Sequence, residues 1–384
     1  KVLNVPNLRF PEFQGEWEYF LINDVCSEFK SGKNIKADSV FECGEYPVYG
    51  GNGLRGYTSS YNHEGSYVLI GRQGALCGNV RSVYGKTYIT EHAIAVAGNE
   101  KSNTSFLHYL FLKMNLGQYS DQSAQPGLAV NKLLKLKVAL PIISEQTKIA
   151  KLLSLLDERI STQSKIIDKL QSLIKGLEDN LLDNPLWEKT YLRSFMQFFS
   201  TNSLSWEQLS YKEGAIRNLH YGLIHGFQTR GINSASLPMI KNEAIPKQYT
   251  LCQVGDVAFA DASEDTGEIA KSVEFVDTIE GDTICGLHTI HGRDIKNRTV
   301  VGFKGFAFNS RYFHNQIKRL AQGTKVFSIT ANNLSSCYVY LPDLDTQTVI
   351  VRLLKSYEEQ LIIDRMIFKQ YEKQKQYLLR QMFI

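Results

Sequence analysis

The chain repeats part of itself at an offset of 201 residues. The segment from Leu140 to Thr147 returns as Leu341 to Thr348, with Leu-Pro at its start and a glutamine (Gln146, Gln347) six residues later. A second echo, Trp17-Glu18 and Trp206-Glu207, has an offset of 189. This many matches in one register predict two similar blocks, each ending in a Leu-Pro signal and a helix.

Both predicted helices carry a heptad pattern. In the first helix, from Glu145 to Leu182, the positions are Ile149, Leu153, Leu156, Ile160, Gln163, Ile167, Leu170, Ile174, Leu177 and Leu181. In the second they are Ile350, Leu354, Tyr357, Leu361, Asp364, Phe368, Tyr371, Lys375, Leu378 and Met382. This spacing is typical of a coiled coil. Gln163 and Asp364 occupy the same place in the two patterns, and we expect them to fix the register; the alternative is a layer where the helices splay and water enters.

The expected fold class is α+β: two mixed α/β domains separated by two long helices that pair as an antiparallel coiled coil. The expected boundaries are 1–140 for the first domain, 141–183 for the central helix, 184–341 for the second domain and 342–384 for the last helix. Strands are expected at 67–70, 93–96, 273–276 and 299–303, and shorter helices at 106–116 and 310–320.

Composition excludes several classes of protein. With 43% hydrophobic and 21% charged residues the chain is an ordinary globular sequence, without a membrane span or the apolar core of a signal peptide. The six cysteines are widely spaced, so we expect free thiols, no metal site and a reducing cytoplasm. A net charge of +4 does not by itself indicate nucleic acid.

The charge distribution is more informative. Residues 256–282 hold nine acids against one base, and residues 293–325 hold eight bases against one acid. This change of sign suggests one face that meets an anion and another that does not. The alternative is two solvated faces that offset each other.

Candidate catalytic motifs fail on their spacing. Asn184-Pro185-Leu186-Trp187 resembles the tetrad of amino-methyltransferases but has the wrong third residue and follows a helix, where Asn-Pro is ordinary stop chemistry. Gly85-Lys86-Thr87 lacks the glycine of a phosphate-binding loop five residues earlier. The acids from Asp261 to Glu268 lack a nuclease pattern, and His288 and His291 would point to opposite faces of a strand. The sequence therefore indicates a binding protein.

Two sets of loops have the chemistry that reads DNA, with forked or amide side chains beside glycines. The candidates in the first block are Tyr49, Asn52, Arg55, Arg72, Gln73 and Asn79, of which the pair Arg72-Gln73 is favoured. The candidates in the second block are Asn218, His220, Tyr221, His225, Gln228 and Arg230. Arg293, Lys304, Arg311 and Lys325 are expected to contact phosphates. For Arg72 the alternative is packing against carboxylates of its own domain.

The whole chain resembles the DNA-specificity subunit of type I restriction–modification systems. The resemblance rests on Asn4–Pro11, on Tyr46–Gly53, on Leu69–Gly74, on the stretch Gly255–Asp265 and, most specifically, on the Leu-Pro-x₄-Gln element that precedes each long helix. The second copy carries Thr346 where the first has Glu145.

The resemblance implies a non-catalytic subunit that reads an asymmetric, bipartite site in double-stranded DNA. It implies two modification subunits that bind S-adenosylmethionine and methylate adenine N6, together with restriction/translocase subunits that use ATP and Mg²⁺. It implies no cofactor in this chain and no membrane partner. Three alternatives stay open: a stand-alone DNA-binding regulator, a single-chain methyltransferase with its site at Asn184, and a coiled-coil scaffold.

Overall fold

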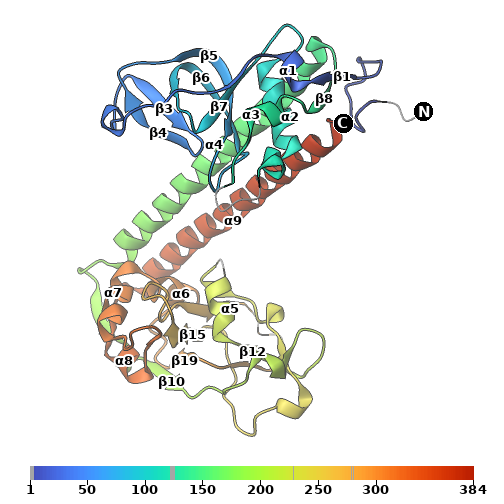
Figure 1. The fold of residues 1–384 in the computed structure, drawn as a ribbon. Coiled ribbons are helices and arrows are strands. Elements are labelled where there is room, and N and C mark those ends of the chain that lie inside the picture. Colours follow the sequence, from blue (N-terminus) through green and yellow to red (C-terminus); the bar gives the residue numbers. More distant parts are fainter. Residues whose placement is uncertain (1–3, 122–125, 228, 278, 280) are drawn as a thin grey trace. The chain divides into compact units, whose positions relative to one another are not determined.

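The computed structural model describes residues 4–121, 126–227, 229–277, 279 and 281–384. The chain forms two compact units (Figure 1): residues 1–164 with 367–384, and residues 165–366. Two long helices run through both units, α4 (Ile143–Leu182) and α9 (Leu344–Gln381), drawn in green and red. The recognition-domain boundaries expected from the sequence stay a prediction, because the compact units divide the long helices and do not end at them.

The predicted heptad positions form the buried stripe of each long helix. None of the twenty positions is exposed, and the residues that begin the two patterns, such as Ile149, Leu153 and Leu354, are among the most deeply buried. In the first unit Leu153 of α4 shares a core with Leu378 of α9, and in the second unit Leu182 of α4 shares a core with Leu354 of α9. The start of one helix thus packs with the end of the other in each unit, which confirms the antiparallel pairing.

The repeated glutamine locks each helix start to the block before it. Gln146 is fully buried; its Nε2 donates to Lys101 O (2.9 Å) and Pro141 O (2.8 Å), and its Oε1 accepts from Asn103 N (2.8 Å). Gln347 is also fully buried and makes the equivalent bonds to Arg298 O, Pro342 O and Val300 N, all at 3.0 Å. Because buried backbone groups need partners, this explains why the glutamine recurs.

Where the copies differ, the contacts differ. Glu145 is fully buried and accepts two bonds from the Arg9 guanidinium, at 2.7 Å each. Its counterpart Thr346 instead closes a local cap with Asp343. The Arg9 bond fastens the amino-terminal segment to the start of the first long helix, and Leu8 N also donates to Gln381 O at the end of the second (2.8 Å).

A short antiparallel strand pair joins the two edges of each block. β1 (Glu18–Leu21) pairs with β8 (Lys137–Leu140), and β9 (Glu188–Tyr191) pairs with β21 (Tyr338–Leu341). Glu18 lies opposite Leu140, and Glu188 lies opposite Leu341. The counterpart of Trp17-Glu18 is therefore Trp187-Glu188, and the expected match to Trp206-Glu207 is wrong. The second block is longer, so no single offset aligns both of its edges.

A six-stranded sheet with the order β2-β7-β5-β6-β3-β4 forms the body of the first unit. Its strands are β2 (Cys26–Ser31), β3 (Tyr46–Gly50), β4 (Gly53–Thr58), β5 (His63–Gly71), β6 (Val80–Ile89) and β7 (Ala93–Gly98). The helices of this unit are α1 (Ile22–Val25), α2 (Thr104–Met114) and α3 (Val130–Leu133). Helix α2 is capped by Asn103, whose side chain accepts from Phe106 N, and it packs Phe106 and Phe111 into the core.

The second unit holds two sheets, with the orders β10-β19-β15-β17-β13 and β11-β14-β12-β18. The strands of the first sheet are β10 (Met196–Phe199), β13 (Gly231–Ile232), β15 (Val257–Ala260), β17 (Ser272–Phe275) and β19 (Thr289–Asp294). Those of the second are β11 (Leu209–Ser210), β12 (Ile216–Leu219), β14 (Met239–Ile240) and β18 (Thr283–Cys285). A further pair, β16 (Ala262–Ser263) and β20 (Phe327–Ser328), stands apart.

The helices of the second unit are α5 (Tyr221–Gly226), α6 (Phe303–Ala307), α7 (Arg311–Leu320) and α8 (Ala331–Ser336). The strand expected at 299–303 is wrong: Gly302 takes a left-handed backbone (φ 95°) and starts α6, while Val300 N bonds to Gln347. The architecture as a whole is the predicted α+β arrangement of mixed domains and two long helices. Among the described helices, none has the length and apolar character of a bilayer-spanning segment.

Candidate nucleic-acid interface

Glycines bring two loops of the first unit together. Gly51 lies in the turn between β3 and β4, where an added Cβ would stand 2.7 Å from His92 O and 3.5 Å from Gly71 Cα. The β3–β4 turn therefore contacts the loop between β6 and β7 and the end of β5, and only a residue without a side chain permits this approach. Asn52 is exposed in the turn, whereas Tyr49 is half-buried beside the sheet's second small core.

Two arginines flank this turn. Arg55 lies across Gly50, whose added Cβ would meet Arg55 Cδ at 2.9 Å, and the Arg81 guanidinium lies against Gly53, at 3.0 Å from the corresponding position. Both side chains are exposed. Arg81 was missed from the sequence, because it is the second residue of β6 and only the fold places it beside the turn.

The favoured pair Arg72-Gln73 belongs to the same surface. The Arg72 backbone is fixed, since its N–H donates to His92 O and its carbonyl accepts from Leu128 N, both at 2.9 Å. Gln73 is exposed, and its Oε1 lies 3.3 Å from His92 Nδ1. Asn79 is also exposed, and its carbonyl accepts from Gly71 N at 2.8 Å. The candidates of the first unit thus lie in adjoining loops and at the ends of β3 and β4 beside them.

The guanidinium groups on this surface are not paired with any described residue. In the part of the chain that the structure describes, Arg55, Arg72 and Arg81 make no side-chain hydrogen bond or ion pair. The alternative for Arg72, packing against a carboxylate of its own domain, therefore finds no support among the described residues. These forks remain available to an external anion or base edge.

In the second unit, the residues predicted to bind DNA are mostly buried or half-buried. Asn218 is fully buried and lies against Gly286, whose added Cβ would stand 2.3 Å from Asn218 Oδ1. His220 is 3% exposed, stacks on Trp206 at 4.4 Å and accepts from Gly222 N at the start of α5; burial lowers its pKa. Tyr221 and His225 are half-buried, and His225 Nδ1 lies 3.2 Å from Glu268. Gln228 lies outside the described residues.

Three of the predicted cations of the second unit are engaged inside the protein. Arg230 contacts two carboxylates of the long helices, Glu178 (3.2 Å) and Glu358 (3.1 Å). Burial raises the pKa of Glu358 to about 7, against the opposing effect of Arg230. Arg293 and Lys304 form ion pairs with the buried acids Asp256 and Glu274. These three side chains form ion pairs inside the unit, so we do not propose them as DNA contacts.

The acidic and basic segments partly neutralise each other. Arg293 forms a fork with Asp256 (2.8 and 2.7 Å), and Lys304 Nζ lies 2.9 Å from Glu274 Oε1 with both side chains buried. Although burial opposes it, the bonds from Arg293 and His291 lower the pKa of Asp256. Asp256 and Glu274 are thus buried partners, so the expectation of a purely acidic surface face is wrong for these two residues.

The exposed cations of the basic segment are Lys296, which precedes α6, and a group in α7 and the segment after it. Arg311 is 71% exposed and 3.9 Å from Asp179, and Lys325 is exposed. Lys318 and Arg319, which were counted in the basic segment but not singled out, lie exposed in the last turn of α7. The side chains of Gln163 and Asp364 are buried, with only 8% and 7% of their surface exposed, and Gln360 donates to Asp364 at 3.0 Å. The role of Gln163 and Asp364 in fixing the helix register stays a prediction.

The motifs considered for catalysis serve local structure. Asn184 Oδ1 accepts from Leu186 N at 3.0 Å and its carbonyl accepts from Trp187 N, which makes a turn after α4. His288 has a left-handed backbone (φ 53°), so the expected strand does not extend back to it, whereas His291 lies in β19.

Comparison with known proteins matches these features to one family. The model of the type I restriction modification DNA specificity domain matches residues 14–172. The type I restriction enzyme EcoprrI specificity subunit of Escherichia coli is 42% identical over 154 residues, which are 39% of this chain and only 38% of that protein. The MjaVIII specificity subunit of Methanocaldococcus jannaschii is 25% identical over 405 residues, covering 97% of this chain and 92% of that protein.

A solved structure matches the fold over its full length. The type I restriction-modification S subunit from M. genitalium superposes with a TM-score of 0.67 and covers 99% of both chains. Its sequence identity is 15%, so this likeness concerns the fold alone.

Proposed function

We propose that the chain belongs to the type I restriction–modification DNA-specificity family, whose model matches residues 14–172, and that it is the subunit that selects the DNA sequence for a modification complex. Each compact unit would read one half of a split site in double-stranded DNA. Since the units differ in sheet order and loop content, the two halves would differ and the full site would be asymmetric.

The observation that carries this proposal is a cluster of three arginine side chains in the first unit that bond to none of the described residues. Arg55, Arg72 and Arg81 surround a turn with Asn52 at its tip, on a rigid sheet. Arginine reads guanine by paired bonds in the major groove, and amides such as Gln73 and Asn79 read adenine. In the second unit the exposed cations Arg311 and Lys325 would contact phosphates, with Lys318 and Arg319 beside them.

The helix starts support docking of a partner in two copies. Ile143 and Leu344 occupy equivalent positions in the first turns of α4 and α9, and they are 41% and 47% exposed. Single exposed apolar residues are common, but their repetition at equivalent positions would offer the same contact to each of two identical partners. We propose that two modification subunits bind here.

Methyl transfer would belong to those partners. S-adenosylmethionine would bind to the modification subunits, and ATP and Mg²⁺ to restriction/translocase subunits, while this chain supplies no catalytic group and no cofactor site for the reaction. The complex would act in the cytoplasm, where its proposed substrate, genomic DNA, is found.

A long-read map of adenine methylation, in cells with and without this chain, tests the proposal. We expect deletion to remove one asymmetric, split motif and complementation to restore it. If the map stays unchanged while the purified chain alone binds a specific DNA tightly, the chain is a stand-alone regulator and the proposal fails. Co-purification of the chain with a methyltransferase provides the second readout.

A further inference from the structure

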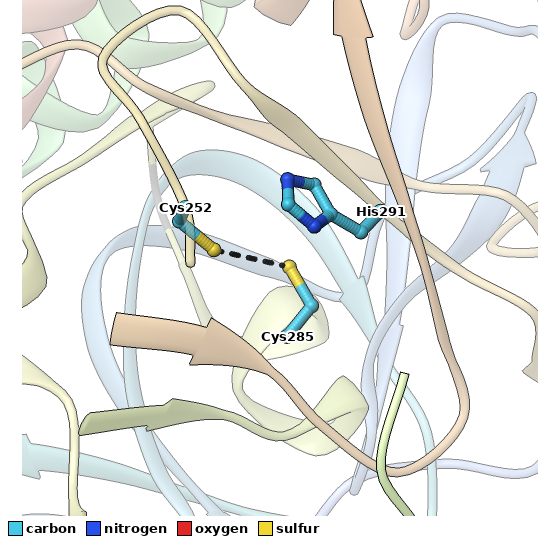
Figure 2. Close-up of side chains that lie close together, drawn as sticks. All are labelled: Cys252, Cys285 and His291. Carbon is cyan, nitrogen blue, oxygen red and sulfur yellow. Dashed lines mark hydrogen bonds between the residues drawn. The ribbon is translucent and has the colours of Figure 1, made fainter. Parts of the chain in front are cut away.

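Three side chains of the kind that bind metals meet inside the second unit. Cys252, Cys285 and His291 are far apart in the sequence, but their ligand atoms all lie within 4.8 Å of one another. The two sulfur atoms are 3.6 Å apart, and the imidazole lies beside them (Figure 2). The three residues are only 6%, 2% and 1% exposed.

The spacing suits a tetrahedral ion better than a disulfide. Zinc–sulfur bonds of about 2.3 Å at tetrahedral angles place two sulfurs about 3.8 Å apart. The observed 3.6 Å is close to this edge length. A disulfide requires about 2.05 Å between the sulfurs, so the pair as it stands is reduced.

The histidine is oriented from behind by a carboxylate. Nε2 of His291 donates to Asp256 Oδ2 at 2.7 Å, and Asp256 is held by the Arg293 fork and by Gln253 N at 2.8 Å. This fixes the ring and leaves Nδ1 as its remaining ligand atom. Metal-bound histidines commonly donate their other N–H to a carboxylate in this way.

The surroundings also suit a buried cation. Two thiolates and a neutral imidazole balance the charge of Zn²⁺, so no net charge is buried. Apolar residues such as Leu219, Ala258 and Phe275 belong to the core that contains both cysteines. Thr283 stands two residues before Cys285 on β18, hence on the same face, and its hydroxyl is buried without a hydrogen-bond partner among the described residues.

We propose that Cys252, Cys285 and His291 bind one Zn²⁺ that cross-links the two sheets of the second unit. Cys285 ends β18 in the four-stranded sheet, His291 lies in β19 of the five-stranded sheet, and Cys252 lies in the segment before β15. The fourth position takes a water, for which the Thr283 hydroxyl is the hydrogen-bond partner. The role is structural and does not depend on DNA binding.

This assignment differs from the expectation that all six cysteines are plain thiols without metal. The spacing rules for cysteine pairs did not detect the site, because its ligands come from three separate segments. The competing account is a thiol pair in an apolar core, joined by a weak S–H···S contact. The two accounts predict different metal contents.

The test is the metal content of the full chain, purified under reducing conditions without chelator, together with the spectrum after exchange with Co²⁺. Wild type should hold about one zinc per chain and give the thiolate charge-transfer and tetrahedral bands of cobalt. Cys252→Ser and Cys285→Ser should lose the zinc and these bands. Cys337→Ser is the matched control, a buried cysteine outside the cluster, and should keep both.

A chelator should lower the midpoint of thermal unfolding in wild type and in Cys337→Ser. Wild type that neither holds zinc nor shows the cobalt bands overturns the proposal, whether or not the variants fold. Zinc retained equally in Cys285→Ser and Cys337→Ser also overturns it, because the metal then lies elsewhere.

Discussion

Replacing the repeated glutamine tests the explanation of the repeat. In Gln146→Leu three backbone groups lose their partners: Pro141 O, whose bond is buried, and Lys101 O and Asn103 N, whose bonds are partly buried. Each such group costs about 1–3 kcal/mol when left unpaired, and relaxation and the greater hydrophobicity of leucine offset part of this. We expect a loss of about 3 kcal/mol in the first unit. Gln347→Leu should cost a similar amount in the second unit, because its bonds are equivalent.

The assay is hydrogen exchange measured peptide by peptide along a denaturant series, which reports the stability of each unit separately. Gln146→Leu should release protection around 101–107, where Asn103 caps α2, and leave 298–306 unchanged. Gln171→Leu, an exposed position on the same helix, is the control and should change stability by less than about 0.5 kcal/mol. A loss below about 1 kcal/mol in Gln146→Leu would refute the reasoning.

Three further predictions concern ion pairs and helix length. Lys304→Ala leaves Glu274 buried without its counter-charge and should destabilise the second unit by about 3–5 kcal/mol, measured by denaturant unfolding; an unchanged stability with weakened DNA binding would return Lys304 to the interface. Burial raises the pKa of Glu358 from 4.5 to about 7, so the folded state holds its proton more tightly and stability should fall as pH rises from 4.5 to about 7. Glu358→Gln should flatten that slope, and an equal slope in both proteins would contradict this. Matched four-residue insertions in α4 and α9 add about 6 Å of helix and should lengthen the unread spacer by about two base pairs; an unchanged spacer in a methylation map would show that the helices do not set it.

The helices could be predicted from the sequence because their burial follows a local rule. A heptad pattern determines which side of a helix is covered, whatever the partner, and the positions from Ile149 to Met382 followed it. The repeat also located Gln146 and Gln347, although their bonds to the preceding block could not be read from spacing.

The binding surface was harder to predict because charge alone does not reveal burial. Lys304 and Arg311 look alike in the sequence, yet one faces Glu274 in the core and the other is 71% exposed. Arg81 escaped notice because its neighbour Gly53 comes from another strand. The zinc cluster around Cys285 likewise depends on contacts between two sheets, which no local pattern records.

The most direct test of the central claim, that each unit reads one half of a split site, is a methylation map of cells that carry Arg72→Ala in place of the wild-type chain. We predict that specificity relaxes at one half of the motif while the other half keeps its bases. Arg311→Ala, a proposed phosphate contact, should lower methylation at all sites without changing the motif. Equal relaxation of both halves in Arg72→Ala, or an unaltered motif at full methylation, would contradict the account.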